Sequence, residues 1–154
     1  MVINKLAALT WCYGYVGRLG ICWGGFTILQ VAALAPEPLK AIISLCSTVD
    51  RFADDIHYKG GCLLNENLGW GATMWSYSSR PPDPAVRDDW REIWLKRLEA
   101  EPFLPSVWLR HQRRDSYWEH GSICEDYGAI KAKVLAVGGW GDAYKNAVPQ
   151  IVQS

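Results

Sequence analysis

One cysteine lies in a glycine-rich segment, GICWGG at residues 20–25. This spacing matches a nucleophile elbow, a tight strand-to-helix turn that holds a nucleophile in a strained conformation with its side chain exposed. Small neighbours are needed because a Cβ atom at the flanking positions would collide with the turn. The pattern indicates attack by the Cys22 thiolate on a carbonyl carbon. The alternative is a small buried cysteine beside ordinary glycine turns.

The segments on either side of Cys22 fit the elements that such a turn joins. Val16–Ile21 is predicted to be a short strand. Phe26–Ala35 is predicted to be a buried helix, which Pro36 and Pro38 end.

Two further segments predict strands of the same parallel sheet. Leu39–Cys46 is a continuous apolar run, typical of a strand buried on both faces, and Lys133–Val137 resembles it. Asp142 follows the last strand, and loops after the carboxyl ends of parallel strands meet at one edge of a sheet. We therefore expect Asp142 at the same edge as Cys22, as a candidate catalytic acid. The alternative is a turn aspartate in a glycine-rich loop.

The expected fold class is α/β, with a partial sheet of three parallel strands and an inserted helical lid. The predicted boundaries are residues 1–47 for the part of the core with the elbow, 48–130 for the lid and 131–154 for the part with the acid. One lid helix is predicted from Pro84 or Ala85 to Ala100, because Trp90, Trp94 and Leu98 form an apolar stripe.

A second lid helix is predicted from about Ser106 to Trp118. It carries the basic run Arg110–Arg114, which fits a solvated helix face or, alternatively, a binding site for an anionic group. The chain has nine tryptophans, which suit either a helical core or the wall of an apolar pocket.

The composition is that of one globular domain, with 154 residues of which 49% are hydrophobic. Basic and acidic residues number 16 each, which argues against nucleic acid or an anionic membrane as a partner. Five scattered cysteines without a CxxC pair indicate free thiols in a reducing compartment. No apolar run spans a bilayer and no full signal peptide is present, so we expect a cytoplasmic protein.

With these parts in place, the sequence resembles the cocaine-esterase-like and X-Pro dipeptidyl-peptidase (CocE/NonD) family of α/β-hydrolases. The similarity extends over nearly the whole chain, and its middle stretches are more specific than the elbow. The stretches that carry it are GRLGICWGGFTILQVAALAPEPLKAIISLCST, DRFADDIHYKGGCLLNENLGW, RPPDPAVRDDWREIWLKRLE, WLRHQRRDSYWEHGSICEDYGAI and VLAVGGWGDAYKNAV.

The resemblance implies a role for five residues. Cys22 takes the place of the family's nucleophilic serine, and Asp142 takes that of the triad acid. The backbone N–H of Trp23 would donate to the oxyanion, while Trp70 and Trp140 would face substrate beneath the lid. No cofactor and no metal are implied.

The sequence also departs from the family pattern. The family's catalytic histidine lies some tens of residues beyond the acid, and no histidine follows Asp142 here. His57, His111 and His120 match lid positions, so we interpret them as structural. The resemblance therefore predicts a central fragment of a larger enzyme, with low or no activity alone.

Three functions remain open at this stage. The first is an acyl hydrolase acting on a small ester or an X-Pro peptide through a covalent acyl-enzyme. The second is a dienelactone-hydrolase-like cysteine hydrolase, although that family lacks a long tryptophan-rich lid. The third is a non-catalytic remnant or binding module. A homo-oligomer is compatible with each.

Overall fold

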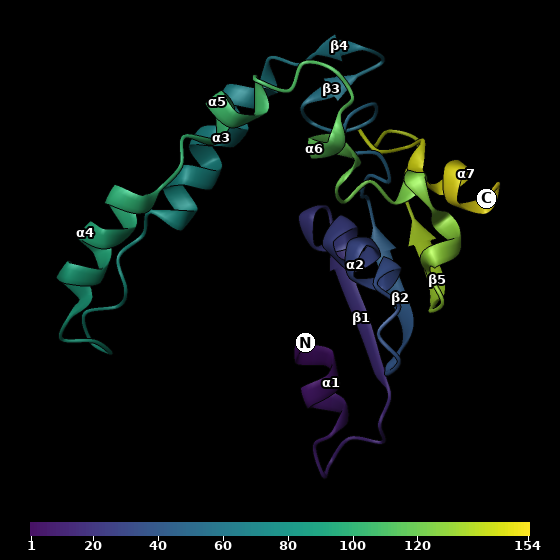
Figure 1. Cartoon of the computed structure of the whole chain (residues 1–154), viewed down its shortest axis with the longest axis horizontal. Helices are drawn as coiled ribbons and strands as arrows, with labels where there is room; N and C mark the ends of the chain where they lie inside the picture. The colour runs from purple at the N-terminus through teal and green to yellow at the C-terminus, as the bar shows by residue number, and fades with distance from the viewer.

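A three-stranded parallel sheet is the centre of the computed structural model, which describes residues 1–154 (Figure 1). Its strands are β1 (Val16–Ile21), β2 (Leu39–Leu45) and β5 (Lys133–Val137), in the order β1-β2-β5. Ile21 pairs with Leu45, and Leu45 with Val137, so all three strands end at the same edge. The predicted strands and fold class are confirmed. The second strand ends one residue early because Cys46 turns to a φ of +46°.

Helix α2 (Trp23–Ala33) packs on β1 and β2. It begins three residues earlier than predicted, directly after Cys22, and Ala35 leaves the helix with a φ of +45° before Pro36. Close packing requires two glycines. A Cβ on Gly20 would lie 2.6 Å from the carbonyl carbon of Gly24, and one on Gly25 would lie 2.7 Å from Ser47 Cβ.

The main core lies between α2 and one face of the sheet. Its centre consists of buried apolar side chains of α2 against β2: Ile28, Leu29, Ala32, Leu39 and Ile42. Helix α1 (Val2–Ala7), beside β1, adds Ile3 to this core, and α7 (Ala147–Val152), beside β5, adds Ala147.

The opposite face of the sheet is open. Leu19 and Ile21 of β1 are 66% and 63% exposed, and Leu135 of β5 is 55% exposed. No helix of the chain is both long and apolar enough to cross a membrane.

The segment between β2 and β5 forms a projecting arm and a returning part. The hairpin β3 (Tyr58–Lys59) and β4 (Cys62–Leu63) leads into α3 (Glu66–Ser78), which the sequence did not predict. In Figure 1, α3, α4 (Trp90–Ala100) and α5 (Leu104–Trp108) extend away from the sheet, with α4 at the tip. The chain then returns through α6 (Ser116–Glu119) and the short 3-10 helices η1 (Ile123–Glu125) and η2 (Tyr127–Ala129).

Two predictions for the lid helices need correction. The helix predicted over residues 106–118 is wrong as one element, because it is divided into α5 and α6. The break is stabilised by Asp115, which accepts a hydrogen bond from Tyr117 N–H at 3.0 Å to begin α6. The helix predicted from residue 84 or 85 begins only at Trp90, because Asp83 accepts from Ala85 N–H in a preceding turn.

Candidate active site

Cys22 occupies the turn between β1 and α2 in a conformation that side chains rarely adopt. Its φ is 51° and its ψ is −113°, which costs about 1–3 kcal/mol unless the surroundings enforce it. Two backbone hydrogen bonds do so: Cys22 N–H donates to Leu45 O at 2.9 Å, and Cys22 O accepts from Phe26 N–H at 3.1 Å. The thiol is thereby held at the carboxyl edge of the sheet, as in a nucleophile elbow.

The first turn of α2 lies directly beside this thiol. Trp23 is the first residue of the helix, so its N–H has no intrahelical acceptor and is free to bind an anion. The helix has 11 residues and no side-chain cap at its N-terminus. Its dipole therefore favours a thiolate, or an oxyanion, at this end.

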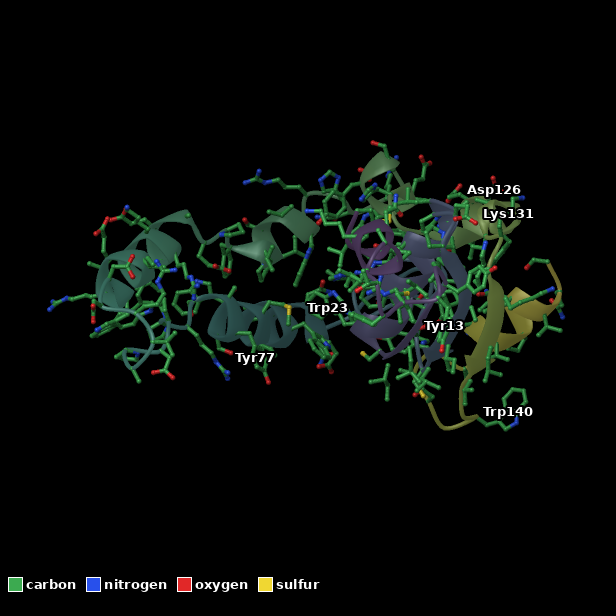
Figure 2. The ribbon with its side chains drawn as sticks, turned by 90° about the horizontal axis from the view of Figure 1, so that it is seen from below. Tyr13, Trp23, Tyr77, Asp126, Lys131 and Trp140 are labelled. Atoms are coloured by element: carbon green, nitrogen blue, oxygen red, sulfur yellow. The ribbon has the colours of Figure 1, made fainter.

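A cavity of about 530 Å³ opens beside Cys22, between the core and the base of the arm. Trp23 lies where the arm meets the core in Figure 2. Most of the wall is apolar, and the apolar side chains that line it include Trp23, Phe26, Trp70, Met74 and Trp108. A cavity of this size and character is typical of small-molecule sites.

The two tryptophans assigned to a substrate pocket have different positions. Trp70 of α3 lines the cavity. Trp140 does not: it is 84% exposed in the loop after β5 and lies far from Trp23 in Figure 2. The glycines around Trp140 give it no neighbour to pack against, so the structure does not place it in the pocket wall.

Asp142 lies at the expected edge of the sheet but does not line the cavity. Its Oδ1 accepts a hydrogen bond from Tyr144 N–H at 2.6 Å, which fixes the loop after β5. The nearby Asp142 carboxylate, together with burial, raises the pKa of Cys46. Cys46 follows the middle strand, β2, so the order along the edge is Cys22, Cys46, Asp142.

A buried polar group in the cavity wall was not predicted from the sequence. Arg51 Nη1 lies 2.6 Å from Asp55 Oδ2, and the Arg51 guanidinium stacks on the Phe26 ring at 4.0 Å. Burial raises the pKa of Asp55, against the opposing effect of Arg51. Tyr144 completes the group, because it lines the same cavity and its pKa is raised by burial and by the nearby Asp55 and Cys22.

The positions of Arg51, Asp55 and Tyr144 in the sequence could have identified them as candidate site residues. Arg51 and Asp55 follow β2, and Tyr144 follows β5, so all three come from loops after strand carboxyl ends. Such loops build the sites of open α/β sheets.

His57 also lines the cavity, although the sequence indicated only a structural role. The Asn67 amide donates to the carbonyls of His57 and Leu64, which turns its Oδ1 toward His57 Nδ1 at 2.9 Å. His57 therefore carries its proton on Nδ1 and leaves Nε2 as an acceptor. Burial lowers the pKa of His57 and so favours this neutral form.

The other two histidines lie in the returning part of the chain. His111 Nδ1 is 2.7 Å from Asp115 Oδ2, and its ring stacks on Tyr117. His120 is exposed.

The parallel sheet, the strained cysteine at its carboxyl edge and the helical insertion before the last strand together define a fold of the α/β-hydrolase type. The model of the X-Pro dipeptidyl-peptidase (S15) family matches residues 1–154. The chain belongs to this family of hydrolases. Membership supports the resemblance drawn from the sequence over the dienelactone-hydrolase-like alternative.

Known proteins similar to the chain agree with this membership. Cocaine esterase from Rhodococcus sp. (strain MB1 Bresler) is 27% identical over 156 residues, which cover 87% of this chain and 27% of that protein.

Among solved structures, a CocE/NonD family hydrolase from Staphylococcus aureus has a TM-score of 0.66 at 16% identity, over 99% of this chain and 29% of its own. An alpha-amino acid ester hydrolase has a TM-score of 0.60 at 17% identity, over 99% of this chain and 28% of its own. At such identities these structures support the fold alone. The chain thus spans less than a third of the length of the relatives it matches.

Proposed function

We propose that this chain carries the nucleophile of an acyl hydrolase, in which Cys22 attacks the carbonyl carbon of an ester or an X-Pro peptide. The observation that carries the proposal is the strained Cys22 at the mouth of an apolar cavity, directly before a helix N-terminus. Family membership and the likeness to cocaine esterase support the same reaction class.

The proposed reaction has two steps. Cys22 Sγ forms a bond to the carbonyl carbon, and the oxyanion of the tetrahedral intermediate accepts a hydrogen bond from Trp23 N–H. The bond to the leaving alkoxide then breaks, and the alkoxide takes up the proton released from the thiol. Water next hydrolyses the thioester, which releases the acid and restores the thiol. An oxyanion donor of this kind contributes about 3–4 kcal/mol to transition-state stabilisation.

Esters are the substrates that this nucleophile favours. An alkoxide leaves a tetrahedral intermediate more readily than an amide nitrogen does, so the intermediate of an unactivated amide tends to expel the thiolate again. The aromatic side chains that line the cavity, Trp23, Phe26, Trp70 and Trp108 among them, suit an apolar or aromatic acyl group.

Asp142 is retained as the proposed triad acid. In this reaction class the acid orients a histidine that takes the proton of the nucleophile. The Asp142 carboxylate accepts a hydrogen bond from the Tyr144 backbone N–H and influences the pKa of Cys46, and neither of these neighbours is a histidine. We therefore propose that activity of the chain alone is low.

Ester hydrolysis with and without the thiol tests the proposal. The Cys22→Ala variant should lose the protein-dependent hydrolysis of p-nitrophenyl acetate and p-nitrophenyl phenylacetate, measured by release of p-nitrophenol. Cys62→Ala is a matched control, because Cys62 is an exposed thiol in the β3–β4 hairpin and outside the cavity.

Equal rates for the wild type and Cys22→Ala would exclude Cys22 as the nucleophile and favour a non-catalytic binding role. The Cys22→Ser variant should be slower than the wild type, because a serine hydroxyl depends on a neighbouring base more strongly than a thiol does.

A further inference from the structure

Tyr144 is the side chain that connects the loop after β5 to the nucleophile. It is only 8% exposed, and it lines the same cavity as Cys22. Cys22 is one of the groups near enough to Tyr144 to raise its pKa. The three cavity residues Cys22, Asp55 and Tyr144 follow three different strands, so their meeting is a product of the fold.

Two contacts hold Tyr144 in this position. Its N–H donates to Asp142 Oδ1 at 2.6 Å, and the carbonyl of the preceding Ala143 accepts a hydrogen bond from Lys59 Nζ. Lys59 is itself fixed by Asp54, with 2.8 Å between Nζ and Oδ1. The backbone of the loop is therefore anchored on both sides of the tyrosine.

We infer that the Tyr144 hydroxyl donates a hydrogen bond to the Cys22 thiolate, and that Tyr144 is thereby a catalytic residue for the thiol. The inference rests on the proposed function, in which Cys22 is the nucleophile. It assigns Tyr144 the stabilisation of the thiolate before attack. The thiol proton leaves to solvent, and the phenol keeps its own proton.

The surroundings of Tyr144 favour a donor over a base. Burial, followed by the negative charges of Asp55 and Cys22, raises the pKa of Tyr144, so the phenol stays protonated at neutral pH. A phenol that remains protonated stabilises an adjacent anion by hydrogen bonding and cannot accept a proton from it.

Asp55 is the competing acceptor for the same proton. It is already bound by Arg51 at 2.6 Å, and its Oδ1 accepts from Ile56 N–H at 2.7 Å. These contacts offset its charge, whereas a thiolate at Cys22 gains a donor from Tyr144. A hydrogen bond from the Tyr144 hydroxyl therefore stabilises a thiolate at Cys22 more than it stabilises the Asp55 carboxylate.

Other titratable groups also face this pair. Lys59 Nζ lies 5.9 Å from the centre of the Tyr144 ring, and Arg51 forms an ion pair with Asp55. Cys46 follows strand β2, and Asp142, which influences its pKa, follows strand β5. A substitution that removes only the hydroxyl leaves each of them in place, which makes Tyr144→Phe the appropriate variant.

The pH dependence of Cys22 alkylation tests the inference. Protein is treated with iodoacetamide between about pH 5 and 10, and the modification of Cys22 is quantified by mass spectrometry after tryptic digestion. Cleavage after Arg18 and Lys40 gives a peptide whose only cysteine is Cys22. For Tyr144→Phe we expect the alkylation midpoint to move up by about one pH unit, with roughly tenfold slower alkylation at pH 7.

Tyr58→Phe is the matched control, because Tyr58 is a buried tyrosine whose hydroxyl has no partner. Its Cys22 profile should equal that of the wild type. An unchanged profile in Tyr144→Phe would overturn the inference.

If Tyr144→Phe fails to fold, alkylation of all five cysteines should become faster together. A second variant then tests the inference. Replacement of Tyr144 by 3-fluorotyrosine keeps the shape and makes the phenol a stronger donor, so the midpoint should move down. No movement would overturn the inference. Alkylation needs no turnover, so failure of the proposed hydrolysis in the Cys22→Ala comparison is a separate result.

Discussion

His57 shows how one buried side chain can be fixed in both tautomer and charge. It is 2% exposed, it contacts the rings of Trp108 and Trp118, and it donates from Nδ1 to Asn67. Its neutral form is the one that fits, because a second proton on Nε2 would place a charge among the aromatic rings. The pKa of His57 is accordingly lower in the folded chain than the ordinary value of 6.5.

This environment predicts a pH-dependent stability. A histidine with a lowered folded pKa binds its proton more readily in the unfolded chain, so stability falls as the pH drops below about 6.5. The loss is at most about 1.4 kcal/mol for each pH unit. We expect the urea concentration at the unfolding midpoint of the wild type to decrease when the pH is lowered from 7.5 to 5.5. The midpoint of His57→Gln should change much less over the same interval.

The exposed His120 provides the control for this measurement. His120→Gln should retain the pH dependence of the wild type. If His57→Gln lost stability over the same interval as steeply as the wild type, burial of His57 would not be its source. The carboxylates with lowered pKa values, Asp50, Asp89 and Asp115, titrate below this interval.

The contact between β1 and α2 shows at the scale of elements why the elbow needs its glycines. Gly20 on the strand and Gly24 on the helix face each other so closely that a Cβ on Gly20 would lie 2.6 Å from the Gly24 backbone. On Gly24 the same atom would meet nothing within 4 Å. The crowding is therefore one-sided.

Alanine at each position tests this asymmetry. Gly20→Ala should destabilise the chain by about 1–3 kcal/mol, because the helix must move away from the strand. Gly24→Ala should be neutral or stabilising, since alanine favours a helix by up to about 1 kcal/mol. Urea denaturation of the two variants measures the difference, and equal effects would contradict the predicted packing.

The sequence predicted the elements whose signals are local. Val16–Ile21 leads directly into the glycine-flanked turn, and Lys133–Val137 is a short apolar run before a glycine-rich loop; the structure confirms the bounds of both strands. Helix α3 escaped prediction because Gly69 and Gly71 weaken its helical pattern. Gly71 is needed there for a tertiary reason, since a Cβ on it would lie 2.2 Å from Pro105 Cγ.

The candidate site was predictable only in part, because local sequence patterns do not record tertiary contacts. Cys22 and Trp70 do share one cavity, and their roles stay predictions. The polar group of Arg51, Asp55 and Tyr144 depends on contacts between residues about 90 positions apart, which no local pattern records. The prediction of one helix over residues 106–118 was wrong because Asp115 begins a new helix there, and the segment before it is held by a tertiary ion pair between Arg114 and Asp50.

At the scale of the whole molecule, the open face of the sheet is an exposed apolar surface. Leu19, Ile21, Leu135 and Val137 are between 45% and 66% exposed on its two outer strands. Parallel sheets are normally covered on both faces, so this surface favours association with other molecules.

A charge on this face should reduce self-association of the chain. Leu135→Glu should lower the fraction of oligomer or aggregate, measured by size-exclusion chromatography with light scattering, with a stability change within about 0.5 kcal/mol. Lys133→Glu is the control, because it also adds negative charge to the same strand without removing exposed apolar surface. Equal association in the Leu135→Glu variant and the wild type would show that another surface is responsible.

The arm and the core contribute to the cavity in different ways. The core supplies Cys22 and its polar neighbours, and the arm supplies Trp70 and Met74 from α3 together with Trp108 from α5. These two helices pack on each other through Gly71 and Pro105, while α4 at the tip has no buried residue. In the proposed reaction, the attacking thiol and the side chains that would select the acyl group therefore belong to parts of the chain that can vary separately. Substitutions in the arm can therefore change the shape of the cavity while the position of Cys22 stays the same.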